Sequence, residues 1–410
     1  MKSNYKRLGD YIYESKERNV NLKATSLLGI NIDKFFMPSV ANIVGTDMSV
    51  YKIVKNGQFA CNRMHVGRDY RLPIALSKSY EEFMVSPAYD VFEINDSEVL
   101  LPEYLMMWFS RKEFDRNAWF YTDADVRGGL NWKALCDMQL PIPTITKQRE
   151  IVKEYNVIQN RINLNKQIIQ KLEETAQTIY KRWFVEFEFS DENGKPYKSN
   201  GGEMLWNEEL GKEIPKGWDV TNLDSEFDIT IGRTPPRVEE EWFNSEDDSI
   251  DWISIKDMAN CDTFIFNTNE KLTNKAVKKF SIPKIPTNTT ILSFKMSVGK
   301  LAITTKEMLS NEAIAHFKTT SYTRLTSEFI YCFLDFFKFN ALGTTSSIVD
   351  SINTKMIKEI SILIPEKENI ESFQIVILNI FSLKKVKEKE NQKLTELKEL
   401  LLSKLATVEN

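Results

Sequence analysis

Five stretches of the chain combine basic, hydroxyl or amide side chains with glycine. They read "NRMHVGRDYR" (62–71), "DVRGGLN" (125–131), "IGRTPPR" (231–237), "SFKMSVGK" (293–300) and "LGTTSSIVDSIN" (342–353). Arginine, lysine, asparagine, serine and threonine are the residue types that bind phosphates and the edges of bases. Glycine lets a backbone approach a ligand closely. For a single arginine or lysine in such a loop, the alternative is an ordinary solvated surface position.

The sequence lacks the motifs of a self-contained active site. It contains no GxGxxG, GxxxxGK[ST], HExxH or GxSxG motif. The acidic run "SEDDSID" (245–251) could hold Mg²⁺ in a nuclease, but a solvated loop is the simpler interpretation. Only 2 histidines and 4 widely spaced cysteines are present, which argues against a zinc centre. We therefore expect no catalytic residues and no metal site.

The composition is that of a globular protein with more than one domain. Of its 410 residues, 42% are hydrophobic and 27% are charged. No apolar run is long enough for a membrane span, and the first residues do not resemble a signal peptide. Together with the isolated cysteines, this predicts a cytoplasmic protein with reduced thiols. The net charge of −4 lacks the basic excess of many nucleic-acid-binding proteins.

One short phrase occurs twice in the chain. "NWKALCDMQLPIP" ends at Pro143 and "NTKMIKEISILIP" ends at Pro365, an offset of 365 − 143 = 222 residues. The same offset relates "QKLEE" (170–174) to "QKLTE" (392–396) without a gap. A period of this length is too long for a solenoid repeat and predicts a duplicated domain.

A long helical pattern follows each copy of the phrase. Between Gln148 and Phe184 there is no glycine or proline, and apolar residues recur in steps of three and four. Asn165 is a polar residue on this seam. The second pattern runs from about Ile370 to Ala406, and its charged middle, "KKVKEKENQK", is expected to be solvated. The predicted seam residues of the second helix are Phe373, Ile377, Ile380, Leu383, Leu394, Leu397, Leu401 and Leu405.

These observations predict an α+β protein with an internal duplication. We expect β-rich domains over residues 1–146 and 205–367, long helices over 147–187 and 368–410, and a Gly- and Asn-rich linker over 188–204. The aromatic run "YKRWFVEFEF" (180–189) could stack on bases, but packing of a helix end against the neighbouring domain is the simpler interpretation.

This layout resembles the specificity subunit of type I restriction–modification enzymes. The phrases that carry the resemblance are "QLPIPTITKQREIV", "KRWFVEFEF", "GRTPPR", "DWISIKDM", "ILSFKMSVGKLAI", "SNEAIAHF" and "GTTSSIVDSINTKMIKEISILIP". Their order, together with the 222-residue offset (353 − 131), extends over essentially the whole chain.

The resemblance implies a function without catalysis. Two target-recognition domains would each read one half of a bipartite site in double-stranded DNA. The long helices would form an antiparallel coiled coil that separates the two domains about a pseudo-two-fold axis. Two methyltransferase subunits, which carry S-adenosylmethionine, would dock on the chain, and two motor-nuclease restriction subunits would complete the complex. The chain itself would hold no cofactor.

Within the five polar stretches and beside them, we predict DNA contacts from the residue types that bind bases or phosphates. In the first domain these are Arg63, His65, Arg68, Arg71 and Arg127, and in the second they are Arg233, Thr234, Lys295, Lys300, Asn311, Thr344 and Ser346. Two departures from the family pattern stand out: the second domain is net acidic, and the first lacks the "GRTPP" phrase.

Two other functional classes fit parts of the sequence. The chain could be a stand-alone or orphan duplicated DNA-binding protein that lacks or competes for partners. It could also be a coiled-coil scaffold with no role in DNA binding. In the specificity-subunit interpretation, helices of roughly 55 Å set the length of an unread spacer between two half-sites.

Overall fold

The computed structural model describes residues 5–41, 45–64, 66–122, 128–243, 248–295, 298–337, 339 and 352–408. The chain divides into two compact units. Unit 1 comprises Met1–Ile162 and Lys393–Asn410, and unit 2 comprises Asn163–Gln392. Both long helices contribute to both units, and the five segments predicted from the sequence stay a prediction.

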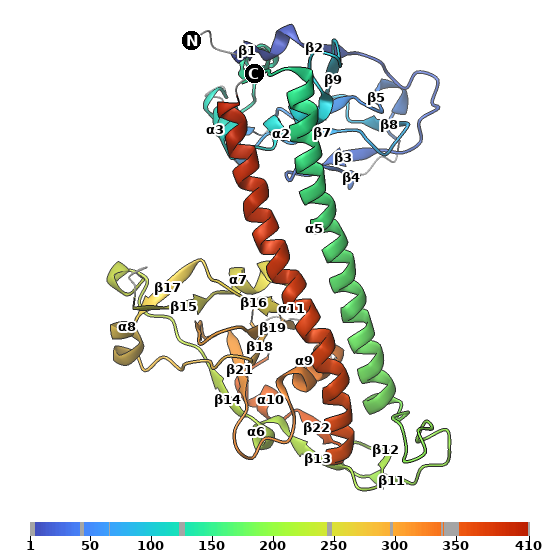
Figure 1. Ribbon diagram of the computed structural model, residues 1–410, viewed down its shortest axis with the longest axis vertical. Helices are drawn as coiled ribbons and strands as arrows, with labels where there is room; N and C mark the ends of the chain where they lie inside the picture. Colours follow the sequence, from blue (N-terminus) through green and yellow to red (C-terminus); the bar gives the residue numbers. More distant parts are fainter. Residues whose placement is uncertain are drawn as a thin grey trace. The chain divides into compact units, whose positions relative to one another are not determined.

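Unit 1 is built on a four-stranded antiparallel sheet with the order β2-β9-β6-β7 (Figure 1). Its strands are β2 (Ile12–Ser15), β9 (Asp90–Ile94), β6 (Phe59–Cys61) and β7 (Ile74–Leu76). Three antiparallel pairs join β1 (Tyr5–Arg7) to β10 (Gln139–Pro141), β3 (Leu28–Ile30) to β4 (Phe36–Pro38), and β5 (Lys52–Lys55) to β8 (Glu82–Val85). The short helices are α1 (Val66–Asp69), α2 (Pro102–Phe109), α3 (Lys112–Phe120) and α4 (Trp132–Asp137).

Unit 2 is built on a five-stranded sheet with the order β14-β21-β18-β19-β16. Its strands are β14 (Asp228–Ile231), β21 (Ile314–Lys318), β18 (Thr290–Ser293), β19 (Lys300–Thr304) and β16 (Phe264–Ile265). A second sheet contains β17 (Glu270–Thr273), β15 (Ser249–Ile253) and β20 (Leu309–Ser310), and two antiparallel pairs join β11 (Met204–Asn207) to β12 (Lys212–Pro215) and β13 (Asp219–Asn222) to β22 (Ser361–Ile364). The short helices are α6 (Leu223–Glu226), α7 (Ile255–Asn260), α8 (Asn274–Lys279), α9 (Ser327–Phe336) and α10 (Thr354–Lys358).

The two units repeat one topology, which confirms the predicted duplication. The strands β2-β9-β6-β7 of unit 1 correspond in order and direction to β14-β21-β18-β19 of unit 2. The repeated phrase forms a short helix followed by a strand in both units. Its first residue caps that helix each time: the Asn131 side chain accepts from the Lys133 amide at 2.8 Å, and that of Asn353 accepts from the Met356 amide at 3.1 Å.

The two long helices pair in an antiparallel manner within each unit. They are α5 (Ile145–Tyr180) and α11 (Lys367–Lys404). In unit 2 the Asn165 amide donates to the Asn391 side chain at 3.0 Å, and the rings of Tyr180 and Phe373 lie 6.3 Å apart. Residue numbers therefore increase along α5 in the direction in which they decrease along α11, so the helices are antiparallel. The expected α+β class and antiparallel coiled coil are thus confirmed.

Unit 1 contains the same antiparallel pairing. Lys398 donates to the Gln159 side chain at 3.2 Å, while Ile151 shares a core cluster with Leu402 and Leu405. Most predicted seam residues of both helices are buried or half-buried and thus act as packing positions, with Leu383 and Leu397 as exceptions.

The aromatic run after α5 is buried in unit 2. A π-helical turn covers Lys181–Val185, and Phe184, Phe187 and Phe189 join the core. Phe189 stacks on Trp218 with ring centroids 5.0 Å apart and on Tyr197 at 4.6 Å. The packing interpretation of this run is confirmed, and part of the predicted linker contributes to the core.

The charged middle of α11 corrects two sequence predictions. Leu383 and Leu397 are 42% and 48% exposed, so their placement on the seam was wrong. The buried residues of this helix continue in steps of three and four through the stretch that was expected to be solvated. They are Ile370, Phe373, Ile377, Phe381, Lys384, Glu388, Asn391 and Leu402. Geometry overrides residue type here, because a regular heptad brings Lys384, Glu388 and Asn391 to the interface.

The buried charges on α11 have specific partners in unit 2. The Glu388 carboxylate accepts from the backbone amides of Thr263 at 3.2 Å and Phe264 at 2.8 Å, at the start of β16. Lys384 forms an ion pair with Glu173 of α5, and its ammonium lies 4.9 Å from the centroid of the Phe381 ring. The helix pair is thereby attached to the edge strand of the sheet through charged groups, whose burial is costly unless they are paired.

Burial shifts the pKa values of Glu388 and Lys384 in opposite directions. It raises the pKa of Glu388 and lowers that of Lys384 from the ordinary 10.5 to about 8, although the Glu388 charge opposes the second shift. Between these two lysine values the unfolded chain binds more protons than the folded one, so the Lys384 contribution to stability rises with pH.

We predict that Lys384→Met removes a pH-dependent part of the stability. The free energy of unfolding of the wild type should gain a contribution between about pH 8 and pH 10.5 that the variant lacks, because a methionine has no proton to release. Denaturant unfolding at several pH values measures it. Lys389→Met, at an exposed position of α11, is the control and should retain the wild-type pH dependence. The same change in the free energy of unfolding with pH in all three proteins would contradict the prediction.

Candidate nucleic-acid interface

The antiparallel register of the unit 2 sheet brings four strand ends to one edge. β14 ends at Ile231, which pairs with Ala315 near the start of β21. β18 ends at Ser293, which pairs with Ile314 on one side and with Lys300, the start of β19, on the other. The segments that follow β14 and β18 and precede β21 therefore lie together. We refer to residues 232–237, 294–295, 298–300 and 310–313 as edge 2.

Backbone contacts hold the segments of edge 2 against one another. The Arg233 amide donates to the Ser310 carbonyl at 2.9 Å, and the Phe294 amide donates to the Ala313 carbonyl at 3.0 Å. Gly232 is required at its position because a Cβ atom there would lie 2.0 Å from the Ser310 carbonyl oxygen. The glycine of "GRTPP" thus serves a close approach between two protein segments.

A buried histidine supports edge 2 from inside the sheet. Nδ1 of His316 lies 3.0 Å from the Thr230 hydroxyl, and Nε2 lies 2.6 Å from the Ser310 hydroxyl. Burial lowers its pKa to about 3, so the imidazole stays neutral at physiological pH. His316 therefore orders Ser310, next to Gly232, and is a satisfied core histidine.

Edge 2 brings together five of the predicted DNA-contacting residues: Arg233, Thr234, Lys295, Lys300 and Asn311. Lys295 is exposed, while Lys300 and Asn311 are half-buried. Arg233 donates to the Phe280 carbonyl at 2.9 Å, and the Thr234 hydroxyl donates to the Glu312 carboxylate. The predicted Thr344 and Ser346 lie outside the described residues.

The corresponding edge of the unit 1 sheet carries the first predicted stretch. Cys61, the last residue of β6, pairs with Ile74 of β7 and with Asp90 of β9. The residues that follow Cys61 therefore leave the sheet where Phe294 and Lys295 leave it in unit 2. Arg63 and Lys295 both stand two residues after the corresponding central strands, β6 and β18. We refer to residues 62–64 and 66–73 together with 128–131 as edge 1.

Two glycines bring the polar stretches of unit 1 into contact. The Gly67 amide donates to the Gly128 carbonyl at 2.7 Å, and a Cβ atom on Gly67 would lie 2.7 Å from the Gly128 Cα atom. The Leu130 amide also donates to the Arg63 carbonyl at 2.9 Å. The described parts of two stretches about 60 residues apart in sequence thus lie together.

The arginines of edge 1 are occupied by neighbouring groups. Arg63 forms an ion pair with Asp90 and donates to the Leu130 carbonyl, so it holds the fold of this edge. Arg68 forms a bidentate pair with the adjacent Asp69 at 2.7 and 3.0 Å. The predicted His65 and Arg127 lie outside the described residues.

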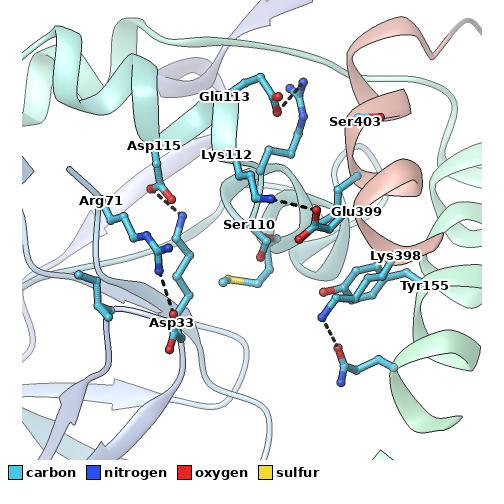
Figure 2. A pocket seen from close by; sticks show the side chains of 16 residues that line it. Asp33, Arg71, Ser110, Lys112, Glu113, Asp115, Tyr155, Lys398, Glu399 and Ser403 are labelled. Carbon is cyan, nitrogen blue, oxygen red and sulfur yellow. Dashed lines mark hydrogen bonds and ion pairs between the residues drawn. The ribbon is translucent and has the colours of Figure 1, made fainter. Parts of the chain in front are cut away.

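Arg71 faces a cleft of about 580 Å³ in unit 1, which Figure 2 shows from close by. The charges that line this cleft are matched with one another. Arg71 pairs with Asp33 at 2.9 Å, Lys34 with Asp115 at 2.8 Å, and Lys112 with Glu399 at 2.9 Å. Burial lowers the pKa of Lys34, while the Asp115 charge raises it. Neutralisation of these three cations by neighbouring carboxylates makes the cleft a poor site for a phosphate.

Sequence reasoning missed an exposed aromatic patch beside edge 1. It consists of Tyr70, Trp119, Phe120 and Tyr121, which are 63%, 45%, 76% and 53% exposed. The rings of Tyr70 and Trp119 lie 5.3 Å apart. Three consecutive aromatics in "AWFYT" (118–122), at the end of an otherwise polar helix, were the available signal.

The described part of the chain contains neither a cluster of metal ligands nor a helix that could span a membrane. Among the described residues, no group of three or more histidine, cysteine, aspartate or glutamate side chains could hold a metal ion. The "SEDDSID" run lies partly outside those residues. No described helix is both long and apolar enough to cross a membrane.

Comparison with known proteins agrees with the sequence resemblance. Residues 215–399 match the family described as "Type I restriction modification DNA specificity domain". The chain is 25% identical to the type I restriction enzyme HindI specificity subunit of Haemophilus influenzae, over 91% of both chains. It is 23% identical to the MjaIX specificity subunit of Methanocaldococcus jannaschii, over 75% of this chain and 68% of that protein.

A solved structure shares the fold. The type I restriction–modification system S subunit from M. genitalium superposes with a TM-score of 0.57 at 13% identity, over 99% of this chain and 96% of that one. The predicted resemblance to type I specificity subunits is thus confirmed. The prediction that the chain is a specificity subunit and not an enzyme agrees with the names of its relatives.

We predict that Gly232→Ala destabilises unit 2. The added methyl group would overlap the Ser310 carbonyl and force the segments of edge 2 apart, at a cost of about 1–3 kcal/mol in the free energy of unfolding. Denaturant unfolding measures the change. Gly29→Ala is the control, because a Cβ there meets no atom within 4 Å. If both variants have the same free energy of unfolding, the close approach of Gly232 to the Ser310 carbonyl does not constrain unit 2.

Proposed function

We propose that this chain, a relative of the type I restriction–modification specificity subunits, selects the DNA sequence for such a complex. Unit 1 would read one half of a bipartite target through edge 1, and unit 2 the other half through edge 2. One observation carries the proposal: the described parts of four of the five stretches chosen for their nucleic-acid chemistry lie at corresponding edges of two sheets with the same strand order.

The two edges differ in chemistry, which supports an asymmetric target. Edge 2 presents Arg233, Lys295, Lys300 and Asn311, which are suited to phosphates and to guanine or adenine edges. Edge 1 presents mainly paired arginines next to aromatic rings. Related surfaces with different side chains would read unlike half-sites from a common docking geometry.

Apolar grooves along the helices support docking of partner subunits. In unit 1 a groove of about 660 Å³ is lined by Val157, Ile158, Leu397, Leu400 and Leu401. In unit 2 a groove of about 780 Å³ is lined by Pro365, Ile370 and Ile375, among others. Val157 and Ile375 are 63% and 69% exposed. One groove per unit would suit two copies of a methyltransferase subunit, which would supply S-adenosylmethionine, and two restriction subunits would complete the complex.

Mapping of methylated adenines across the genome tests this function. Cells that carry the gene should show methylation at a split, asymmetric motif, and cells without it should lose methylation at that motif alone. The full chain should also co-purify with methyltransferase subunits, which a scaffold without a DNA role or an orphan DNA-binding protein need not do. An unchanged methylation map after removal of the gene would refute the proposal.

We further propose that the helix pair sets the unread spacer. Insertion of one heptad after Ile162 in α5 and one after Gln392 in α11 preserves the seam and lengthens both helices by about 10 Å, or roughly three base pairs. The methylated motif should keep its half-sites and gain spacer base pairs. A heptad added to α11 alone is the control, which should disrupt assembly because the seams no longer match. If the double insertion leaves the spacer length unchanged, the helices do not set it.

A further inference from the structure

The aromatic patch beside edge 1 is built for contact with a partner. Tyr70 packs on Trp119, and Phe120 lies 5.3 Å from Tyr121 by ring centroids. All four rings are largely exposed, although aromatic rings contribute most to stability when they are buried. A contiguous apolar surface of this kind on a domain is characteristic of an interaction site.

Backbone strain at Tyr70 also indicates a functional surface. Its φ of 56° lies in the left-handed region, which is unfavourable for a bulky side chain. Such strain persists where the surroundings impose it and concentrates at binding sites. Core packing of the ring does not compensate this strain, since Tyr70 is 63% exposed.

The patch is continuous with edge 1. Tyr70 belongs to the stretch that follows β6, and Thr122, directly after the patch, forms an isolated antiparallel bridge with Leu130. The Leu130 amide donates to the Arg63 carbonyl, next to the Gly67–Gly128 contact. An occupant of edge 1 would therefore touch these rings, and under the proposed function that occupant is double-stranded DNA.

Among the described residues of edge 1 the arginines are ion-paired, which makes apolar contact a main means of reading there. Arg63 is committed to Asp90 and the Leu130 carbonyl, and Arg68 to Asp69. Apart from the phenol groups and the indole N–H of Trp119, the aromatic rings offer only apolar contact, and in the major groove the one apolar base feature that distinguishes sequence is the 5-methyl group of thymine. A guanine or cytosine edge offers these rings no comparable partner.

We propose that unit 1 recognises thymine methyl groups through Trp119 and Phe120, assisted by Tyr70 and Tyr121. This inference rests on the proposed function and adds the base chemistry of one half-site. Unit 2, with its lysines, Arg233 and Asn311 at edge 2, would read by hydrogen bonds instead. The half-site of unit 1 should therefore contain at least one thymine whose methyl group contributes to affinity.

The test uses the full chain assembled with its methyltransferase subunits and duplexes that contain the methylated motif. Each thymine in both half-sites is replaced in turn by deoxyuridine, which removes only the methyl group. At one or more positions in one half-site, affinity should fall about fourfold, the ratio that follows from burying one methyl group. In Trp119→Ala/Phe120→Ala the thymine and deoxyuridine duplexes should bind equally well.

Trp206→Ala is the matched control, because Trp206 is a 60% exposed tryptophan on the β11–β12 hairpin of unit 2. This variant should retain the fourfold deoxyuridine effect, and thermal unfolding verifies that all variants fold. If deoxyuridine has no effect at any position while the motif is still selected, the inference is overturned and the proposed function stands. If the double variant weakens both duplexes alike and keeps the deoxyuridine effect, the rings do not read the methyl group. Failure to select any motif would refute the proposed function itself.

Discussion

Antiparallel pairing around one central strand of each sheet is the constraint on which the candidate interface depends. Because β18 is paired on both sides, its end is fixed beside the starts of β19 and β21. β6 occupies the same place in unit 1, between β7 and β9. Segments far apart in sequence are then forced to share an edge whatever their side chains. The side chains there can diverge while the geometry stays the same, which suits a pair of related surfaces that read different sequences.

Sequence reasoning succeeded where a feature repeats or is local. The 222-residue offset (353 − 131) located a capping asparagine, a short helix and a strand in both units. It also gave the long helices, since an uninterrupted heptad pattern needs no knowledge of the rest of the fold. The residue types of Arg233, Lys295 and Asn311 suggested nucleic-acid contacts but did not predict that these residues lie together. Their common edge follows from strand order, which no local pattern contains.

The failures have a common physical cause, namely that pairing partners are distant in sequence. Lys384 and Glu388 read as solvated charge, yet Glu173 and the amides of β16 make their burial possible. Arg63 read as a free basic residue because Asp90, its ion-pair partner, is 27 residues away. A buried ion pair and an exposed one look the same in a sequence, and only the fold distinguishes them.

The charge balance of the chain has a consequence for how a complex would bind DNA. With a net charge of −4, and with cations such as Arg68 and Arg71 neutralised by adjacent carboxylates, the chain has little capacity to displace counterions from phosphates. Selectivity without a strong grip on the backbone is an advantage when partner subunits supply that grip, because non-specific binding by the reader would compete with its search. An apolar surface at edge 1 follows the same logic. Contact with a thymine methyl group contributes to affinity only when the domain lies on the correct sequence.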